Sequence, residues 1–153
     1  MSWLRTRIPP PAVALVFALG MRGLASASPR LEMSDTARII LGATLAVAAL
    51  LFSISSVLAF KRARTTLNPV HPGKATSLVT SGIFRVTRNP MYLSLGFLLC
   101  AWAVYLSSAW ALIGVAAFVL YVDRLQIIPE EEVLAAMFGT EYAAYRAHVR
   151  RWL

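Results

Sequence analysis

Charged residues, cysteines and histidines are all scarce in this chain of 153 residues. Only 14% of its residues are charged, against about 25% in a typical soluble domain. Hydrophobic residues make up 58%, and the mean hydropathy is +0.65, so an ordinary soluble globular protein is excluded. One cysteine, Cys100, excludes a disulfide framework, and His71 and His148 are too few for the usual ligand set of a zinc site. We therefore expect no metal site.

Long uncharged runs define the fold class. The run from Ile39 to Phe60 would span about 33 Å as a helix, enough to cross a hydrocarbon core of roughly 30 Å. The uncharged run 91–122 is too long for one crossing and is interrupted at Ser107-Ser108, which predicts a helical hairpin. Its second arm can continue from Ala109 to about Ile128, with Asp123 and Arg124 near an interface.

The first apolar segment, about residues 9–25, begins with three prolines, and its clean apolar stretch, Ala12 to Met21, is short. Ala25-Ser26-Ala27 resembles a signal-peptide cleavage site, but the prolines make a poor leader, so we favour a retained helix. We thus predict an all-α, polytopic membrane protein with about four transmembrane helices plus C-terminal amphipathic helices. Leading helices at about 9–25 and 38–60 occupy residues 1–60, a cytoplasmic loop occupies 61–90, and the hairpin and C-terminal helices occupy 91–153.

Basic residues indicate the orientation of these helices. Four crossings place both termini on one side, and that side holds most of the Lys and Arg residues, so the positive-inside rule makes it cytoplasmic. We expect an integral protein of the bacterial inner-membrane type. The basic residues cluster at membrane boundaries, which argues against nucleic-acid binding and suits contact with membrane lipids. Those assigned to the cytoplasmic side are Arg5, Arg7, Lys61, Arg62, Arg64, Lys74, Arg85, Arg88, Arg124, Arg146, Arg150 and Arg151.

Acidic residues are concentrated after the last predicted span. No Asp or Glu lies between Asp35 and Asp123, and five of the seven then occur within residues 123–141. One interpretation is helix chemistry, because Pro129 suits a first helical turn and glutamates there complement the helix dipole. The alternative is a ligand that requires carboxylates. The pattern alone leaves both open.

The C-terminal segment is amphipathic, with apolar side chains at three- and four-residue spacing. Gly139-Thr140 resembles the end of one helix and the start of another, so we expect two short helices lying back on the membrane or on the bundle. Arg150-Arg151-Trp152 suits an interfacial anchor in either case.

The central loop of about 29 residues is long enough to suggest a function. It ends at Asn89, a good N-cap residue, and Pro90, a good first helical residue. This pattern can simply start a transmembrane helix. A helix N-terminus beside Arg88 is also suited to a carboxylate or phosphate, and together with the glutamates it would suit a zwitterionic ligand.

At this point the motifs resemble a known family. The motifs occur in this order: the segment 82–92 (GIFRVTRNPMY), a hairpin, Pro129-Glu130-Glu131, and then Phe138-Gly139, Tyr142, Tyr145 and Arg151-Trp152 in the tail. Together they are similar to the isoprenylcysteine carboxyl methyltransferase and phospholipid methyltransferase family of integral membrane enzymes. The likeness covers about residues 68–153. The leading 60 residues resemble only the variable first helices of such proteins.

The resemblance implies S-adenosylmethionine (SAM) bound on the cytoplasmic side, between the last two spans, the loop and the C-terminal helices. The residues that match the family's Arg-His-Pro-x-Tyr cofactor element are Arg88, Asn89, Pro90 and Tyr92, while Glu130 and Glu131 match its double glutamate. Asn89 departs from the usual His, which puts prenylcysteine specificity in doubt. The glycine fingerprint of a Rossmann unit is absent from the sequence.

The chemistry of SAM fits these residue types. Glu130 or Glu131 can face its ammonium, Tyr92 or Tyr142 its sulfonium, and Arg88 with the Pro90 helix terminus its carboxylate. A carboxylate acceptor is already nucleophilic, whereas an amine needs a base, for which Glu130 and Glu131 are the candidates.

We expect a lipophilic methyl acceptor, with a prenylcysteine-like carboxylate or a lipid amine, that enters from the membrane. Arg146 and Arg150, four residues apart, are candidates to hold an anionic head group, or they form a solvated, lipid-facing strip. Two rival functions stay open: an NADPH-dependent membrane reductase of related fold, and a non-catalytic membrane scaffold. The sequence leaves the oligomeric state open.

Overall fold

The computed structural model describes residues 8–63 and 77–153, and every regular element within them is helical. This confirms the predicted all-α fold. Residues 64–76 of the predicted loop at 61–90, including His71, lie outside the described residues, as do Arg5 and Arg7.

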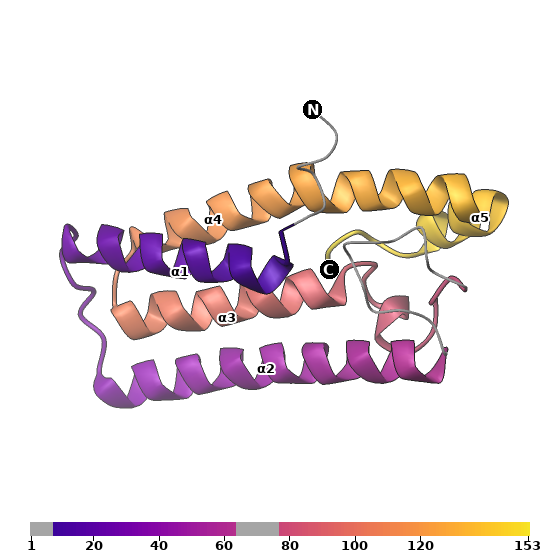
Figure 1. The fold of residues 1–153 in the computed structure, drawn as a ribbon. Helices are drawn as coiled ribbons and strands as arrows, with labels where there is room; N and C mark the ends of the chain where they lie inside the picture. Colours follow the sequence, from indigo (N-terminus) through magenta and orange to yellow (C-terminus); the bar gives the residue numbers. More distant parts are fainter. Residues whose placement is uncertain (1–7, 64–76) are drawn as a thin grey trace.

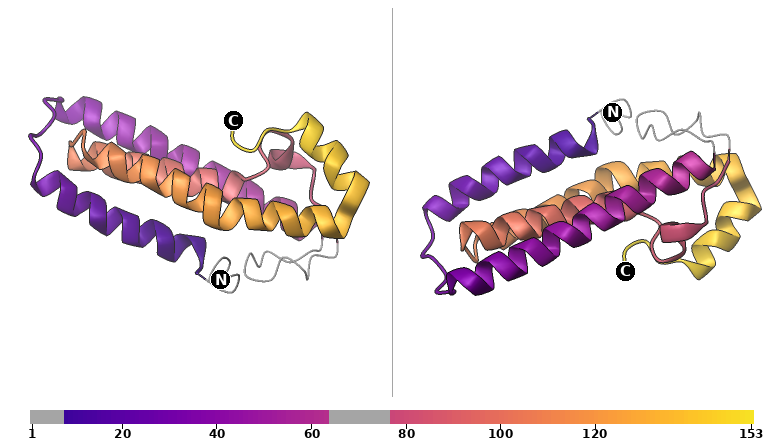
Figure 2. Two further views of the ribbon diagram at one scale, coloured as in Figure 1. Left: turned by 90° about the horizontal axis from the view of Figure 1, so that it is seen from above. Right: turned by 90° about the horizontal axis from the view of Figure 1, so that it is seen from below.

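Four apolar helices lie side by side in an elongated bundle (Figure 1). They are α1 (Pro10–Ser26), α2 (Asp35–Arg62), α3 (Pro90–Leu106) and α4 (Ala111–Val122). Helix α3 contacts all three others, with α2 on one side and α1 and α4 on the other, as the two turned views in Figure 2 also show. Helix α2 and the continuous helical segment Ala111–His148 are long and apolar enough to cross a membrane, whereas α1 and α3 are shorter apolar helices of 17 residues.

Helix α1 is part of the bundle core. Met21 is fully buried against Gly114 of α4, where a Cβ atom would overlap the Met21 side chain. Trp102 of α3 donates its indole N–H to the carbonyl of Ala18 over 3.0 Å. The Phe17 ring packs edge-on against Phe118 with 5.7 Å between centroids. These contacts show how a short apolar segment docks as a helix on α3 and α4.

Ser107 and Ser108 form the tip of the hairpin, as the sequence predicts. Ser107 adopts a left-handed backbone conformation that ends α3, with φ 50°. Its carbonyl accepts the N–H of Leu31 over 2.7 Å, and Ser108 shares a 2.6 Å hydrogen bond with Ser28. The tip is therefore fastened to the connection between α1 and α2.

The second arm continues past the predicted span without a break. Helix α4 passes into a π-helical turn, η3 (Asp123–Ile127), and then into α5 (Ile128–His148). The turn immediately precedes Pro129, whose missing N–H and bulky ring disturb the regular hydrogen-bond ladder of a helix. Pro129 does lie in the first turn of α5, together with Glu130 and Glu131, as one interpretation of the sequence expected. Because the helical segment runs on from α4 through η3, however, this turn is not a free helix N-terminus.

Helix α5 bends where the sequence predicts a boundary. Gly139 has φ 47° and ψ −117°, a conformation that favours glycine, and it divides α5 into two arms. The chain leaves the helix at Val149, which is extended, and the tail runs back toward the start of α3 (Figure 1). The second arm and the tail thus cover one end of the bundle.

Candidate active site

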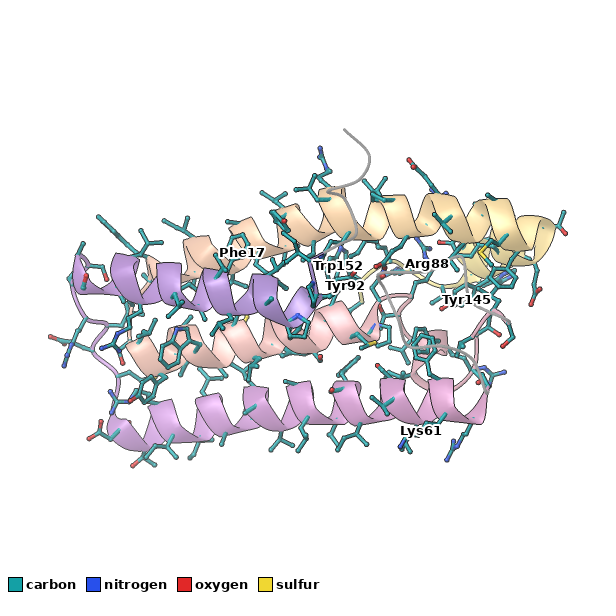
Figure 3. The ribbon with its side chains drawn as sticks, viewed as in Figure 1. Phe17, Lys61, Arg88, Tyr92, Tyr145 and Trp152 are labelled. Atoms are coloured by element: carbon teal, nitrogen blue, oxygen red, sulfur yellow. The ribbon has the colours of Figure 1, made fainter. Side chains whose placement is uncertain are left out.

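Four segments meet at the end of the bundle where α3 begins. They are the residues before α3, the π turn η3, the first turn of α5, and the C-terminal tail; Figure 3 shows Arg88, Tyr92 and Trp152 in this region. The connection into α3 includes a short 3-10 helix, η2 (Gly82–Arg85), which is held because the Tyr145 hydroxyl donates to the Phe84 carbonyl over 2.7 Å. Segments far apart in the sequence therefore converge on one site.

Glu131 is the centre of this site and is 7% exposed. Arg88 Nη2 lies 2.7 Å from its Oε1, and Arg151 Nη2 lies 2.7 Å from its Oε2. Arg151 Nε also donates to Oε1 over 3.2 Å. Burial by itself would raise the pKa of Glu131, but the hydrogen bonds and charges of the two arginines outweigh it and lower the pKa. Glu131 is therefore a buried, ionised carboxylate with both oxygens in use.

Arg151 connects this carboxylate to the π turn. Its Nη1 donates to both oxygens of Asp123, over 3.2 and 3.3 Å. Hydrogen bonds to Glu131, together with the nearby carboxylates, raise the pKa of Arg151 further above its already high value. Arg151 thus joins η3, α5 and the tail, and the expected lipid-facing anchor is wrong for this residue. Trp152 also packs against the bundle core, so Arg150 alone of the three is exposed.

Backbone hydrogen bonds fix the tail against the start of α3. The Arg88 amide donates to the Arg150 carbonyl over 2.9 Å, and Arg88 Nη1 donates to the Val149 carbonyl over 2.6 Å and the Arg146 carbonyl over 3.3 Å. Thr87, which is fully buried, donates its hydroxyl to the Arg151 carbonyl over 3.0 Å. The tail therefore forms one side of the site.

Asn89 and Pro90 position the start of α3 in different ways. Pro90 is the first residue of the helix, as expected. Asn89 occupies the N-cap position, but its side chain makes no capping bond and instead donates to the Arg151 carbonyl over 3.1 Å. The expectation that Asn89 caps α3 through its side chain is wrong, because the side-chain amide is hydrogen-bonded to the backbone of the tail instead.

Glu130 and Tyr92 form a second pair beside the Glu131 network. The Tyr92 hydroxyl donates to Glu130 Oε1 over 2.7 Å, and Tyr92 is 5% exposed. Burial, and to a lesser degree the Glu131 charge, raise the pKa of Glu130 to about 7, while the Tyr92 hydrogen bond opposes the shift. Unlike Glu131, Glu130 has no arginine partner in the described part of the chain. Its carboxyl group is therefore suited to gain or lose a proton near neutral pH.

Tyr142 places an aromatic ring in the same region. It is 2% exposed, on the arm of α5 after Gly139, and its ring centroid is 6.3 Å from that of Tyr145. Burial and the neighbouring Glu131 raise the pKa of its hydroxyl, which stays neutral at physiological pH. The site thus combines an exchangeable carboxyl group with buried aromatic surface.

Most of the residues singled out from the sequence are brought together here, and two are not. Arg146 and Arg150 have exposed side chains, and α5 ends at His148. They therefore do not share one face of the last helix, as their spacing suggested, although their backbone carbonyls accept hydrogen bonds from Arg88.

Sequence reasoning did not give site roles to Thr87, Asp123 or Arg151. The sequence does offer an indication that Asp123 has a charged partner. It is a carboxylate that directly follows a long uncharged run, where a charge needs a partner. Within residues 8–63 and 77–153, no three His, Cys, Asp or Glu side chains are grouped as a metal site requires.

Comparison with known proteins decides the family. Residues 37–141 match the model of the phospholipid methyltransferase family. The chain belongs to this family. The match includes nearly all of α2, the whole of α3 and α4, and the first arm of α5, and hence Arg88, Tyr92, Glu130 and Glu131, whereas the tail with Arg151 lies beyond it. Membership assigns the chain to a family of membrane methyltransferases and confirms the resemblance stated above.

A shorter protein is similar to part of this chain. An uncharacterized protein of Haemophilus influenzae is 46% identical over 63 residues, which is 41% of this chain and all of that protein. No solved structure matches the chain. The family match is therefore the comparison that indicates an activity for the site.

Proposed function

We propose that this protein is a SAM-dependent methyltransferase that acts on a lipophilic acceptor. The observation that carries the proposal is the Tyr92–Glu130 pair, a carboxyl group with a pKa near 7 beside the Arg88–Glu131–Arg151 network. A proton acceptor of this kind, at the end of an apolar bundle, is what methylation of a membrane-borne amine requires. The active site and both termini are assigned to the cytoplasmic side by the positive-inside rule.

The residues present fit SAM in charge and in aromatic character. When bound, SAM supplies an electrophilic methyl group on a positively charged sulfur, and it carries an ammonium and a carboxylate. Glu130 is the carboxylate with spare capacity for the ammonium, and Tyr92 and Tyr142 offer aromatic surface for the sulfonium. Arg88 Nε is buried and has no hydrogen-bond partner among residues 8–63 and 77–153, so it can donate to the carboxylate.

Glu131 supports the site in a different way. Both of its oxygens are held by arginines, so it is less available for a ligand than Glu130. We assign Glu131 to holding Arg88 in position, together with Asn89 and Pro90 at the start of α3. This refines the expectation that the two glutamates share one role.

The acceptor decides whether Glu130 acts as a base. A prenylcysteine-like carboxylate is already nucleophilic, whereas a lipid amine must lose a proton, which Glu130 accepts in its ionised form. The acceptor enters from the membrane, and Arg146 and Arg150, exposed beside the tail, are available for an anionic head group or for membrane lipids.

The rival functions are less well supported. An NADPH-dependent reductase needs basic side chains at the site for the 2′-phosphate, but Arg88 and Arg151 are already paired with Glu131 and Asp123, and the carboxyl groups of Glu130 and Glu131 are unfavourable neighbours for that dianion. A non-catalytic scaffold has no use for a partly buried carboxyl group such as Glu130, which has no arginine partner in the described residues and whose burial carries a free-energy cost.

Transfer of a labelled methyl group tests the proposal. The purified protein would be supplied with methyl-labelled SAM and either phosphatidylethanolamine, which presents an amine, or a farnesylated cysteine, which presents a carboxylate. With SAM at saturating concentration, we expect label in one of these lipids and at least a 10-fold lower rate with Glu130→Gln if the amine is the acceptor. The exposed Glu132→Gln is the matched control and should retain full activity. No incorporation into either lipid, or into a total membrane lipid extract, would contradict the proposal.

A further inference from the structure

Gln126 is a buried amide whose carbonyl oxygen is unused. The residue lies in the π turn η3 and is 4% exposed. Its Nε2 donates to the carbonyl of Ile8, just before α1, over 2.8 Å. Its Oε1 is buried and has no hydrogen-bond partner in the described part of the chain. The side chain therefore offers one acceptor that the described protein residues do not satisfy.

Such an acceptor is costly in an apolar core. A buried polar atom left without a partner costs about 1–3 kcal/mol, and native structures contain few of them. Its neighbours along the inner face of the helix, Val122 and Ile127, are apolar and fully buried, so an apolar residue would pack in the same place.

The position of Gln126 relates it to the proposed methyl-transfer site. Gln126, the fourth residue of the π turn, precedes Glu130 by four residues, so the two lie about one helical turn apart on the same continuous helical segment. Gln126 is thus on the membrane side of the Tyr92–Glu130 pair, between that pair and the apolar length of α4.

We propose that the amide carbonyl of Gln126 binds the ligand of this site by accepting a hydrogen bond from an N–H or O–H group. The inference rests on the proposed function and adds a specificity residue to it. Two sources offer such a donor: the head group of the methyl acceptor, and the amino or hydroxyl groups of SAM. The acceptor head group is the favoured source, because it would approach Glu130 from the membrane side, where Gln126 lies.

Two substitutions separate ligand binding from a purely structural role. Gln126→Glu keeps an oxygen acceptor but loses the donor to the Ile8 carbonyl, whereas Gln126→Met keeps the length and loses both. If the Gln126 carbonyl binds the ligand, Gln126→Glu should retain binding and Gln126→Met should lose it. A role confined to anchoring Ile8 predicts that both variants behave alike. Trp102→Phe is the control, because it removes another hydrogen bond to α1, at Ala18, far from this end of the bundle.

Binding would be measured on the purified full chain in detergent micelles as the ligand-dependent rise in unfolding temperature. The probes are SAM, and phosphatidylethanolamine and phosphatidylcholine of the same acyl composition, which differ in whether the head group has N–H donors. We expect the wild-type protein and Gln126→Glu to prefer phosphatidylethanolamine, and Gln126→Met to bind it about 10-fold more weakly and lose the preference. If instead SAM binding weakens in Gln126→Met and is unchanged in Gln126→Glu, the hydrogen-bond donor belongs to the cofactor.

Two outcomes would overturn the inference in distinguishable ways. If the wild-type protein binds SAM or phosphatidylethanolamine and the two Gln126 variants match each other or the wild type for all probes, Gln126 is not a ligand-binding residue, and the proposed function stands. If the wild-type protein binds none of the probes, the proposed function fails together with the inference.

Discussion

Arg88 and Glu131 are 43 residues apart in the chain and form an ion pair with 2.7 Å between Nη2 and Oε1 and only 9% of each side chain exposed. The pair joins the start of α3 to the start of α5, and Arg151 completes it from the tail. A buried charge of this kind is tolerated only when it is paired and hydrogen-bonded. The geometry of the site therefore depends on this network being complete.

Replacement of Glu131 by Gln should destabilise the protein strongly. The variant leaves Arg88 without its only carboxylate partner in the described chain, and removing one member of a buried pair costs about 3–5 kcal/mol. Thermal unfolding in detergent would measure the loss. The exposed Asp35, paired with Arg38 in an exposed ion pair, supplies the control Asp35→Asn, which should unfold like the wild type. Equal stability of Glu131→Gln and wild type would contradict the buried network.

Arg151 should matter for the order of the tail as well as for stability. We expect Arg151→Gln to cost about 2 kcal/mol, because the side chain is 28% exposed and loses contacts to both Asp123 and Glu131. Hydrogen exchange at the Arg88 amide, which donates to the Arg150 carbonyl, should become faster. Arg150→Gln, with an exposed side chain, is the matched control. Unchanged exchange in Arg151→Gln would mean that the ion pairs do not hold the tail.

The rate of methyl transfer to an amine acceptor should rise with pH around neutrality. Glu130 has a pKa of about 7 and accepts a proton only when ionised, so the rate should increase through about pH 7. The Tyr92 hydrogen bond lowers this pKa, and Tyr92→Phe should therefore move the rise to higher pH. A pH–rate profile of both proteins with phosphatidylethanolamine checks the prediction. A shift to lower pH in Tyr92→Phe would exclude Glu130 as the group that titrates.

The docking of α1 can be tested at its closest approach to α4. Gly114→Ala would place a methyl group against the buried Met21, and such overpacking costs about 1–3 kcal/mol. Gly20→Ala, on the facing helix with no atom within 4 Å of the added Cβ, should leave stability unchanged or slightly improved. Thermal unfolding of the two variants compares them directly. Equal effects would argue that α1 does not pack on α4 as described.

Local patterns in the sequence predict the helices and their breaks. Uncharged runs indicate α2 and the hairpin, Ser107-Ser108 marks the tip, Pro90 marks the start of α3 and Gly139 marks the bend of α5. Each of these features follows from burial, backbone freedom or a missing N–H within a few residues. The family motifs around Arg88 and Glu130 are local as well, which is why the order of residues along the chain is enough to identify the family.

The partners of the site residues are set by contacts that no local pattern encodes. Periodicity shows that the tail is amphipathic, but it does not show that Arg151 turns inward to Asp123 and Glu131. Asn89 has the right identity and place for a cap, yet the returning tail takes its side-chain amide. The spacing of Arg146 and Arg150 suggests one helix face only if the helix continues, and it ends at His148. In each case a segment far away in the sequence decides the outcome.

Calorimetric binding of SAM and NADPH to the purified protein tests the central claim most directly. The account predicts saturable binding of SAM and none of NADPH, with binding of SAM at least 10-fold weaker in Glu130→Gln and unchanged in the control Glu132→Gln, whose side chain is exposed. Saturable binding of NADPH with no binding of SAM would contradict the account and favour a reductase.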